Sequence, residues 1–111
     1  MGRTRVYSKV VNIAASSSGT VDFFTAEAGR PGRINNVVIV ATSTLTDCLI
    51  YIKKNDIIVL PDGTEGIPAV AQPVSIPCNI QIHSGDAVRI YYNNTSASDV
   101  VAVIIATVEY V

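Results

Sequence analysis

The sequence contains no stretch with the spacing of an amphipathic helix. Nowhere over about ten positions do hydrophobic residues recur at i, i+3, i+4 and i+7, the spacing that places them on one helical face. The chain instead consists of short runs rich in Val, Ile and Thr, separated by Gly, Pro, Asn, Asp and Ser. This pattern predicts eight strands, over residues 3–13, 19–25, 33–42, 47–54, 56–60, 74–82, 86–92 and 99–110.

Eight strands without a helix predict one all-β domain over residues 1–111, an antiparallel β-sandwich with jelly-roll topology. The longest connection, residues 61–73, holds three Pro and two Gly, which argue against a helix or a central strand there. We interpret it as a loop that passes from one sheet to the other. An immunoglobulin-like sandwich is the alternative, but it would usually carry a buried Trp, and this chain has none.

Two of the predicted strands are hydrophobic on both faces. In residues 99–110, Val101, Val103 and Ile105 alternate with residues that are also hydrophobic. In residues 33–42, Val38 and Val40 alternate with further hydrophobic residues in the same way. A strand with one face in water usually alternates hydrophobic with polar residues. We therefore expect both faces of these strands to be covered.

The jelly-roll topology places these two strands side by side. Its first, eighth, third and sixth strands form one sheet, and its second, seventh, fourth and fifth form the other. The outward side chains then form one hydrophobic patch, made of Val38 and Val40 (or Val37 and Ile39) with Val101, Val103 and Ile105.

A continuous exposed hydrophobic patch usually marks a contact surface. Complete burial of each aliphatic side chain contributes about 1.5–3 kcal/mol, before the entropy of association is subtracted. We predict that this patch binds another copy of the chain. The alternative is that the loop over residues 61–73 folds across it, with Ile67, Ala69, Val70 and Ala71 as the cover.

The strand spacing, the long connection after the fifth strand and the segment SGDAVRIYYNN (residues 84–94) resemble small single jelly-roll domains. Such domains occur in viral coat, spike, fibre and decoration proteins and in trimeric tumour-necrosis-factor-like proteins. The resemblance implies a structural protein that assembles into a trimer or lattice, with copies of itself and with other virion proteins. It also implies a location in the virion, or in the cytoplasm before assembly.

Catalytic and metal-binding motifs are missing from the sequence. One His and two Cys, without a CxxC or HxxxH spacing, do not suit a zinc site, and no nucleophile motif such as GxSxG is present. We expect neither enzymatic activity nor a cofactor. Cys48 and Cys78 both lie at predicted inward positions, where we expect buried free thiols. The alternative is a disulfide between them, which could form only where the two sheets approach closely.

A binding module is the second functional hypothesis. Tyr91 and Arg89 are predicted to point outward from the same strand, where they would contact a carbohydrate or a receptor. The hydrophobic excess, however, lies on strand faces rather than in loops, which favours assembly. A glycan array would separate the two hypotheses.

The charges and the N-terminus argue against other partners. A net charge of −1 and a small cluster of Arg3, Arg5 and Lys9 give no specific nucleic-acid site, so we interpret that cluster as a solvated strand edge. The first residues lack the hydrophobic stretch of a secretion signal. The longest hydrophobic run, residues 100–106, is far shorter than the ~20 residues that cross a membrane.

Overall fold

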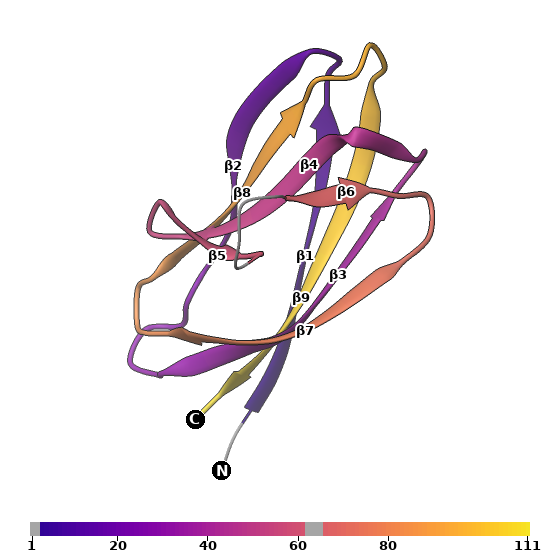
Figure 1. Cartoon of the computed structure of the whole chain (residues 1–111). Coiled ribbons are helices and arrows are strands. Elements are labelled where there is room, and N and C mark those ends of the chain that lie inside the picture. The colour runs from indigo at the N-terminus through magenta and orange to yellow at the C-terminus, as the bar shows by residue number, and fades with distance from the viewer. Residues whose placement is uncertain (1–2, 62–65) are drawn as a thin grey trace.

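The computed structural model describes residues 3–61 and 66–111, which form two antiparallel sheets that face each other (Figure 1). These described residues contain nine strands and no helix. The strands are β1 (Arg3–Ile13), β2 (Ser17–Thr25), β3 (Gly32–Ala41), β4 (Leu45–Lys54), β5 (Ile57–Leu60), β6 (Ile67–Ala69), β7 (Val74–Ile82), β8 (Ala87–Asn94) and β9 (Val100–Tyr110). The all-β class is therefore as predicted.

The order of strands within each sheet also agrees with the prediction. One sheet has the order β1-β9-β3-β7, and the other has the order β2-β8-β4-β5, with β6 paired to β4. With β6 set aside, these are the two sets of neighbours expected from the sequence. The predicted bounds lie within two residues of the observed ones; β1 and β7 match, while β2 and β4 begin two residues earlier than predicted, at Ser17 and Leu45.

The long connection after β5 is the main correction. The prediction of eight strands missed β6, whose Ile67 and Ala69 are buried and pair with β4, while Pro68 between them is exposed. A strand of three residues is too short for its alternation to be recognised, and its proline argued against it. The backbone N–H of Ala41 donates to the carbonyl of Val70 at 2.8 Å, which joins this segment to β3. Residues 62–65 of the predicted loop lie outside the described residues.

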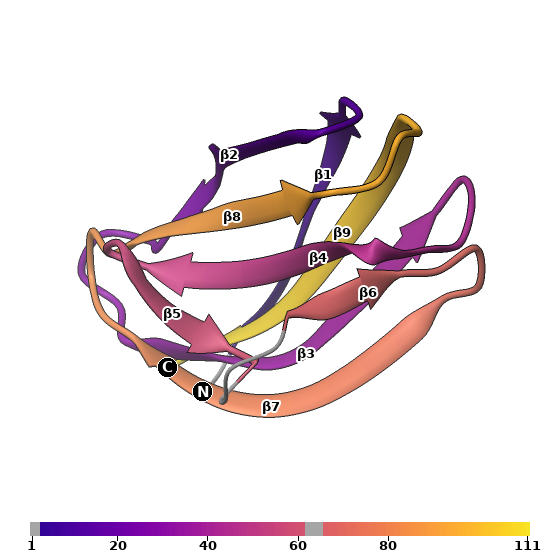
Figure 2. The same ribbon diagram turned by 45° about the horizontal axis from the view of Figure 1, so that its top comes forward.

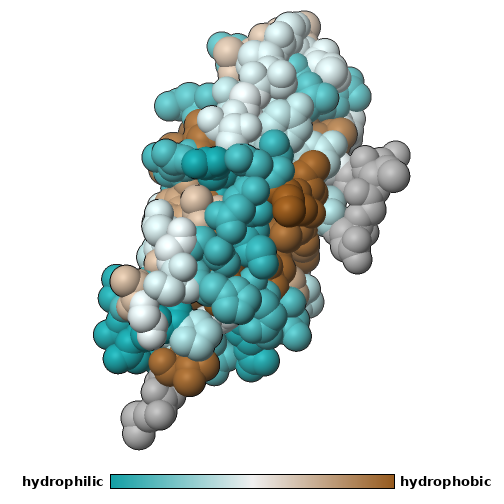
Figure 3. All heavy atoms as spheres, turned by 90° about the vertical axis from the view of Figure 1, so that its left-hand side faces the viewer, coloured by the Kyte–Doolittle hydropathy of each residue, from teal (hydrophilic) through white to brown (hydrophobic). Residues whose placement is uncertain are grey.

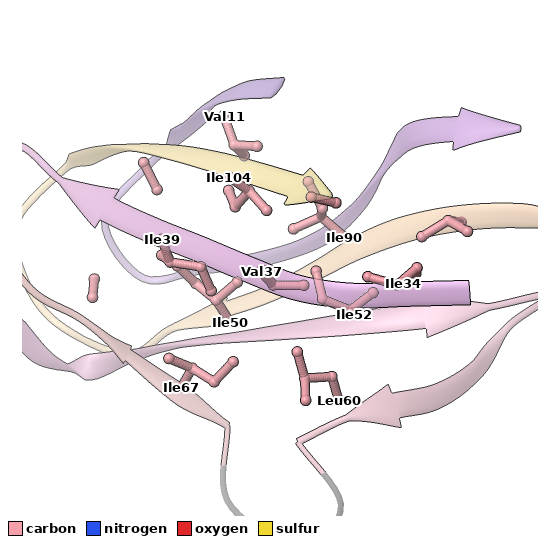
Figure 4. Packing of buried hydrophobic residues seen from close by; sticks show 14 of the residues in the cluster. Val11, Ile34, Val37, Ile39, Ile50, Ile52, Leu60, Ile67, Ile90 and Ile104 are labelled. Atoms are coloured by element: carbon pink, nitrogen blue, oxygen red, sulfur yellow. The ribbon is translucent and has the colours of Figure 1, made fainter. Parts of the chain in front are cut away.

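One hydrophobic core fills the space between the sheets. Figure 4 shows side chains of both sheets pointing toward each other there, with Ile104, Ile39 and Val37 on one side and Ile50 and Ile90 on the other. Every second residue of β9, from Val100 to Tyr110, is buried, and the residues between them are partly exposed. The inward face of this strand is thus the one that begins at Val100.

A tyrosine pair closes the end of the core nearest the termini. Tyr110 is 1% exposed, its hydroxyl lies 2.8 Å from that of Tyr7, and it accepts the backbone N–H of Glu27 at 3.2 Å. Tyr7 stacks on Phe24 with ring centroids 4.1 Å apart. Gly32 is required beside Tyr110, because a Cβ at this position would lie 2.8 Å from the tyrosine ring. Tyr7 therefore contacts β9 in its own sheet and β2 in the opposite sheet.

The titration of Tyr7 predicts a loss of stability at alkaline pH. Burial and the hydrogen bond to Tyr110 raise the pKa of Tyr7 from 10.0 to about 12. The neutral phenol therefore stabilises the fold fully below pH 10, and this contribution is lost as the pH rises through 12. We expect Tyr7→Phe to reduce the fall in unfolding free energy between those pH values, as measured by urea denaturation. The control is Tyr91→Phe, which changes an outward-facing tyrosine. If the unfolding free energy of Tyr7→Phe falls with pH as steeply as that of the wild type and of Tyr91→Phe, this assignment is contradicted.

Candidate functional site

The outer face of the β1-β9-β3-β7 sheet carries almost no charge. The register places Val6, Ser8, Val10 and Asn12 of β1 beside the outward residues of β9, and Val38 and Val40 of β3 on its other side. Among the described outward positions, only Arg33 and Glu109 are charged. Their side chains form an ion pair of 3.3 Å at the end of the sheet near the termini. The rest of the face is aliphatic or uncharged polar.

The five predicted interface residues gather at the centre of this face. Val40 lies opposite Val103, and Val38 lies opposite Ile105, while Val101 is the next outward residue of β9. Each of these side chains is partly exposed. We call these five residues the outer patch: Val38, Val40, Val101, Val103 and Ile105. The structure thus brings together all of the residues that the sequence singled out for an interface.

The sequence left open which residues of β3 point outward, and their burial in the structure answers this. Val37 and Ile39 are fully buried in the core, so Val38 and Val40 are the outward residues. Of the residues named for the alternative cover, Ile67 and Ala69 are buried against β4 in the opposite sheet, so these two do not cover the outer patch. Within residues 3–61 and 66–111, the outer patch therefore remains partly exposed.

Two residues of β1 extend the outer patch and were missed from the sequence. Val6 and Val10 are 64% and 59% exposed, and Val10 lies directly opposite Val103. Both lie on the same side of the strand as Ser8, and the strand also holds several charged residues, so its sequence suggests a polar segment. The available signal was their position in the predicted sheet, where the first strand neighbours the eighth.

The outer face of the other sheet has a different character. Arg89 forms ion pairs with Asp22 at 3.1 Å and Asp56 at 2.7 Å, and these two contacts raise its pKa. Tyr91 points outward from the same strand, as predicted, with its ring centroid 5.4 Å from that of Tyr51. The ammonium of Lys53 lies 4.8 Å from the centre of the Tyr91 ring. Arg89 and Tyr91 are thus already engaged by neighbouring side chains.

The fold resembles that of a phage capsid chain. The match is titled "Cyanophage Pam1 capsid asymmetric unit"; it has a TM-score of 0.57 and 16% identity, and it covers 99% of this chain and 86% of that one. A further match, to dimeric latent PorU from Porphyromonas gingivalis, has a TM-score of 0.37 and 13% identity, over 93% of this chain but 13% of that one. No protein family and no curated protein matches the sequence. At this level of identity, the capsid match shows a shared fold.

The cysteines take only part of the expected arrangement. Both are free, and Cys48 is fully buried, but Cys78 is partly exposed because it lies on the edge strand β7. Burial raises the pKa of both thiols. In the part of the chain that the structure describes, no three His, Cys, Asp or Glu side chains cluster as metal ligands. The same residues contain no helix long and hydrophobic enough to cross a membrane.

Proposed function

We propose that this chain is a structural subunit of a virus particle, and that it binds further copies of itself through the outer patch. Its fold is an eight-stranded jelly roll to which β6 is added. The sheet orders β1-β9-β3-β7 and β2-β8-β4-β5 support this topology, because they alternate the strands between two sheets as two Greek keys do. Its role is mechanical rather than catalytic.

The observation that carries the proposal is the uncharged outer face around the outer patch. Removing a charge from water is costly, and here the Arg33–Glu109 pair is the one charged feature among the described outward residues. The face therefore loses little hydration energy when a protein covers it. The aliphatic side chains of the outer patch, extended by Val6 and Val10, then supply the favourable hydrophobic term.

The capsid match supports the viral setting. The matched chain is of similar length, since 99% of this chain covers 86% of it, and it comes from a capsid asymmetric unit. A chain of this size and fold therefore suits a place in a virion, where it would contact its own copies, in a trimer or a lattice, and other virion proteins. It would occur in the cytoplasm before assembly.

Replacing Val103 with lysine tests the interface. The charge would sit at the centre of the outer patch, so we expect the fold to persist while the dissociation constant between copies rises by about 100-fold, or ~3 kcal/mol. Size-exclusion chromatography with light scattering measures the mass of each species. The matched control is Thr20→Lys, which adds the same charge to the outer face of the other sheet. A monomeric wild type at micromolar concentration, or equal loss of assembly in both variants, would contradict the proposal.

A carbohydrate- or receptor-binding role is the weaker candidate. Neighbouring tyrosines at positions 51 and 91 favour it, because sugars stack on aromatic rings. Against it, Lys53 already lies over Tyr91, and two carboxylates neutralise Arg89. Saturable binding of a monomer to a glycan array, lost in Tyr91→Ala, would favour this candidate over self-association.

A further inference from the structure

The edge of β1 is the longest regular edge among the described strands. The two sheets end in β1 and β7 and in β2 and β5, with the short β6 also beside β4. β7 contains Pro77, which has no backbone N–H to donate, and β2 shifts register between Asp22 and Phe24. β5 and β6 have four and three residues. β1 instead keeps one unbroken register with β9 over eleven residues, so it lacks the proline, the bulge and the short length that protect edge strands from pairing.

One side of the β1 backbone has no partner strand. Among the described strands, β1 pairs only with β9, and Figure 2 shows it as the last strand of its sheet. About half of its backbone N–H and C=O groups therefore point away from β9, because these groups alternate in direction along a strand. From Arg3 to Val10, every residue is exposed except Tyr7, which is partly buried. The described residues thus leave this part of the edge open to an added strand.

Three cations lie along this open edge, namely Arg3, Arg5 and Lys9. They occupy the face of β1 that also carries the buried Ile13. Arg3 pairs with Glu27, while Arg5 and Lys9 form no ion pair with any described residue. Two β1 edges placed antiparallel would bring these cations together, which disfavours pairing between copies. A strand that carries carboxylates would be attracted to the same edge.

We propose that the β1 edge binds an acidic extended segment of another protein, which adds to the sheet as a strand beside residues 3–10. Backbone hydrogen bonds to the open edge hold the segment, and its alternate side chains set the specificity. Residues directly opposite each other on neighbouring strands lie about 5 Å apart, so carboxylates on one face of the segment come beside Arg5 and Lys9. Its other face comes beside Val6 and Val10, where aliphatic side chains fit. This site goes beyond the proposed function and does not depend on self-association.

A second copy of this chain does not supply such a segment from its described edge strands. β5, β6 and β7 contain neither Asp nor Glu. The most exposed side chains of β5 are Ile57 and Ile58, and Figure 3 shows a hydrophobic area on that side of the molecule. β2 has one carboxylate, Asp22, and Arg89 already binds it at 3.1 Å. The occupant that fits the β1 edge is therefore a strand of a different protein.

Two synthetic peptides test the charge requirement. One alternates Glu with Val, and the other alternates Lys with Val at the same length. We expect saturable binding of the Glu peptide by fluorescence anisotropy, and binding of the Lys peptide about 10-fold weaker or less, because the cross-strand charge pairs become repulsive. Equal affinity for the two peptides, or no saturable binding of the Glu peptide, would overturn the proposal.

Charge reversal on β1 is the matched test in the protein. In the double variant Arg5→Glu with Lys9→Glu, we expect the preference to invert, with the Lys peptide bound about 10-fold more tightly than the Glu peptide. Both positions are exposed, so the fold should persist by circular dichroism. The control is Lys53→Glu with Lys54→Glu, which makes the same change of net charge on β4 and should keep the wild-type preference. An equal change of preference in both double variants would overturn the assignment to the β1 edge.

Methylated peptides test the addition of a strand. In a paired antiparallel strand, the N–H groups of every second residue face the neighbouring strand. Methylation of one alternate set of amides in the Glu peptide should abolish binding, and methylation of the other set should largely preserve it. Amide hydrogen exchange of the protein should also slow within residues 3–10 when the peptide binds. Equal binding of the two methylated peptides would show that charge alone attracts the segment, and would overturn strand addition.

Two further measurements separate this site from other kinds of binding. If a single-stranded oligonucleotide competes for the β1 edge as tightly as the Glu peptide does, the edge is a general polyanion site and the proposal is overturned. Val103→Lys, the variant that tests self-association, should bind the Glu peptide as the wild type does, because it leaves the β1 edge unchanged. A failure of the proposed self-association therefore leaves this inference standing.

Discussion

Replacing Ile104 with lysine is expected to unfold the protein, whereas the same replacement at Val103 leaves it folded. Ile104 is fully buried between the sheets, and its neighbour Val103 points outward. The Ile104 change removes a core side chain, which costs about 2–5 kcal/mol, and buries an unpaired ammonium at a further cost of several kcal/mol. Together these losses match the total stability of about 5–15 kcal/mol that a small domain has.

Circular dichroism and urea denaturation measure the difference between these two variants. Val101→Lys and Ala102→Lys provide a second adjacent pair with the same opposite orientations, outward and inward. A folded Ile104→Lys beside an unfolded Val103→Lys would mean that the faces of β9 are inverted, and with them the location of the outer patch.

Truncating Tyr110 to alanine is expected to cost about 3–5 kcal/mol of unfolding free energy. Tyr110 is among the largest fully buried side chains, and its removal leaves a cavity where β1, β3 and β9 meet. Tyr110→Phe keeps the ring and removes only the hydroxyl that joins Tyr7 and the backbone of Glu27, so we expect a loss of about 1–2 kcal/mol.

Chemical denaturation of both Tyr110 variants checks this ordering. Tyr51→Ala, which truncates an outward tyrosine on the opposite sheet, is the matched control and should cost much less. Equal losses in Tyr110→Ala and Tyr51→Ala would show that the terminal end of the core is not packed as described.

The pattern of residues predicted the strands, and the expected jelly-roll topology supplied their order in each sheet. In that order, the two strands that are hydrophobic on both faces, β3 and β9, are neighbours in the middle of one sheet. The turn residues between strands fixed where each strand ends, because Gly, Pro, Asn and Asp favour backbone conformations that interrupt a ladder. The two-sided hydrophobic pattern, together with the neighbouring positions that this topology gives the two strands, identified the five residues of the outer patch.

The limits of prediction follow from long-range contacts. Val6 and Val10 became part of the candidate surface only because the register sets Val10 opposite Val103. Cys78 shares the inward parity of core residues, yet β7 lies at the edge of its sheet and leaves the thiol partly exposed. Parity gives the face on which a side chain lies, and the neighbouring strand decides whether that face is covered.

The all-β class and the alternation of inward and outward side chains follow from the residues along the chain, because they depend on local conformational preference and on the two-residue period of a strand. The order of the strands was expected only from jelly-roll topology, because pairing joins segments far apart in the chain. The tertiary structure alone decided which edges stay open. The pairing of β6 with β4, and the exposure of Ile57 and Ile58 on the edge strand β5, depend on which strands lie side by side. Those contacts join residues far apart in the chain, and no local pattern encodes them.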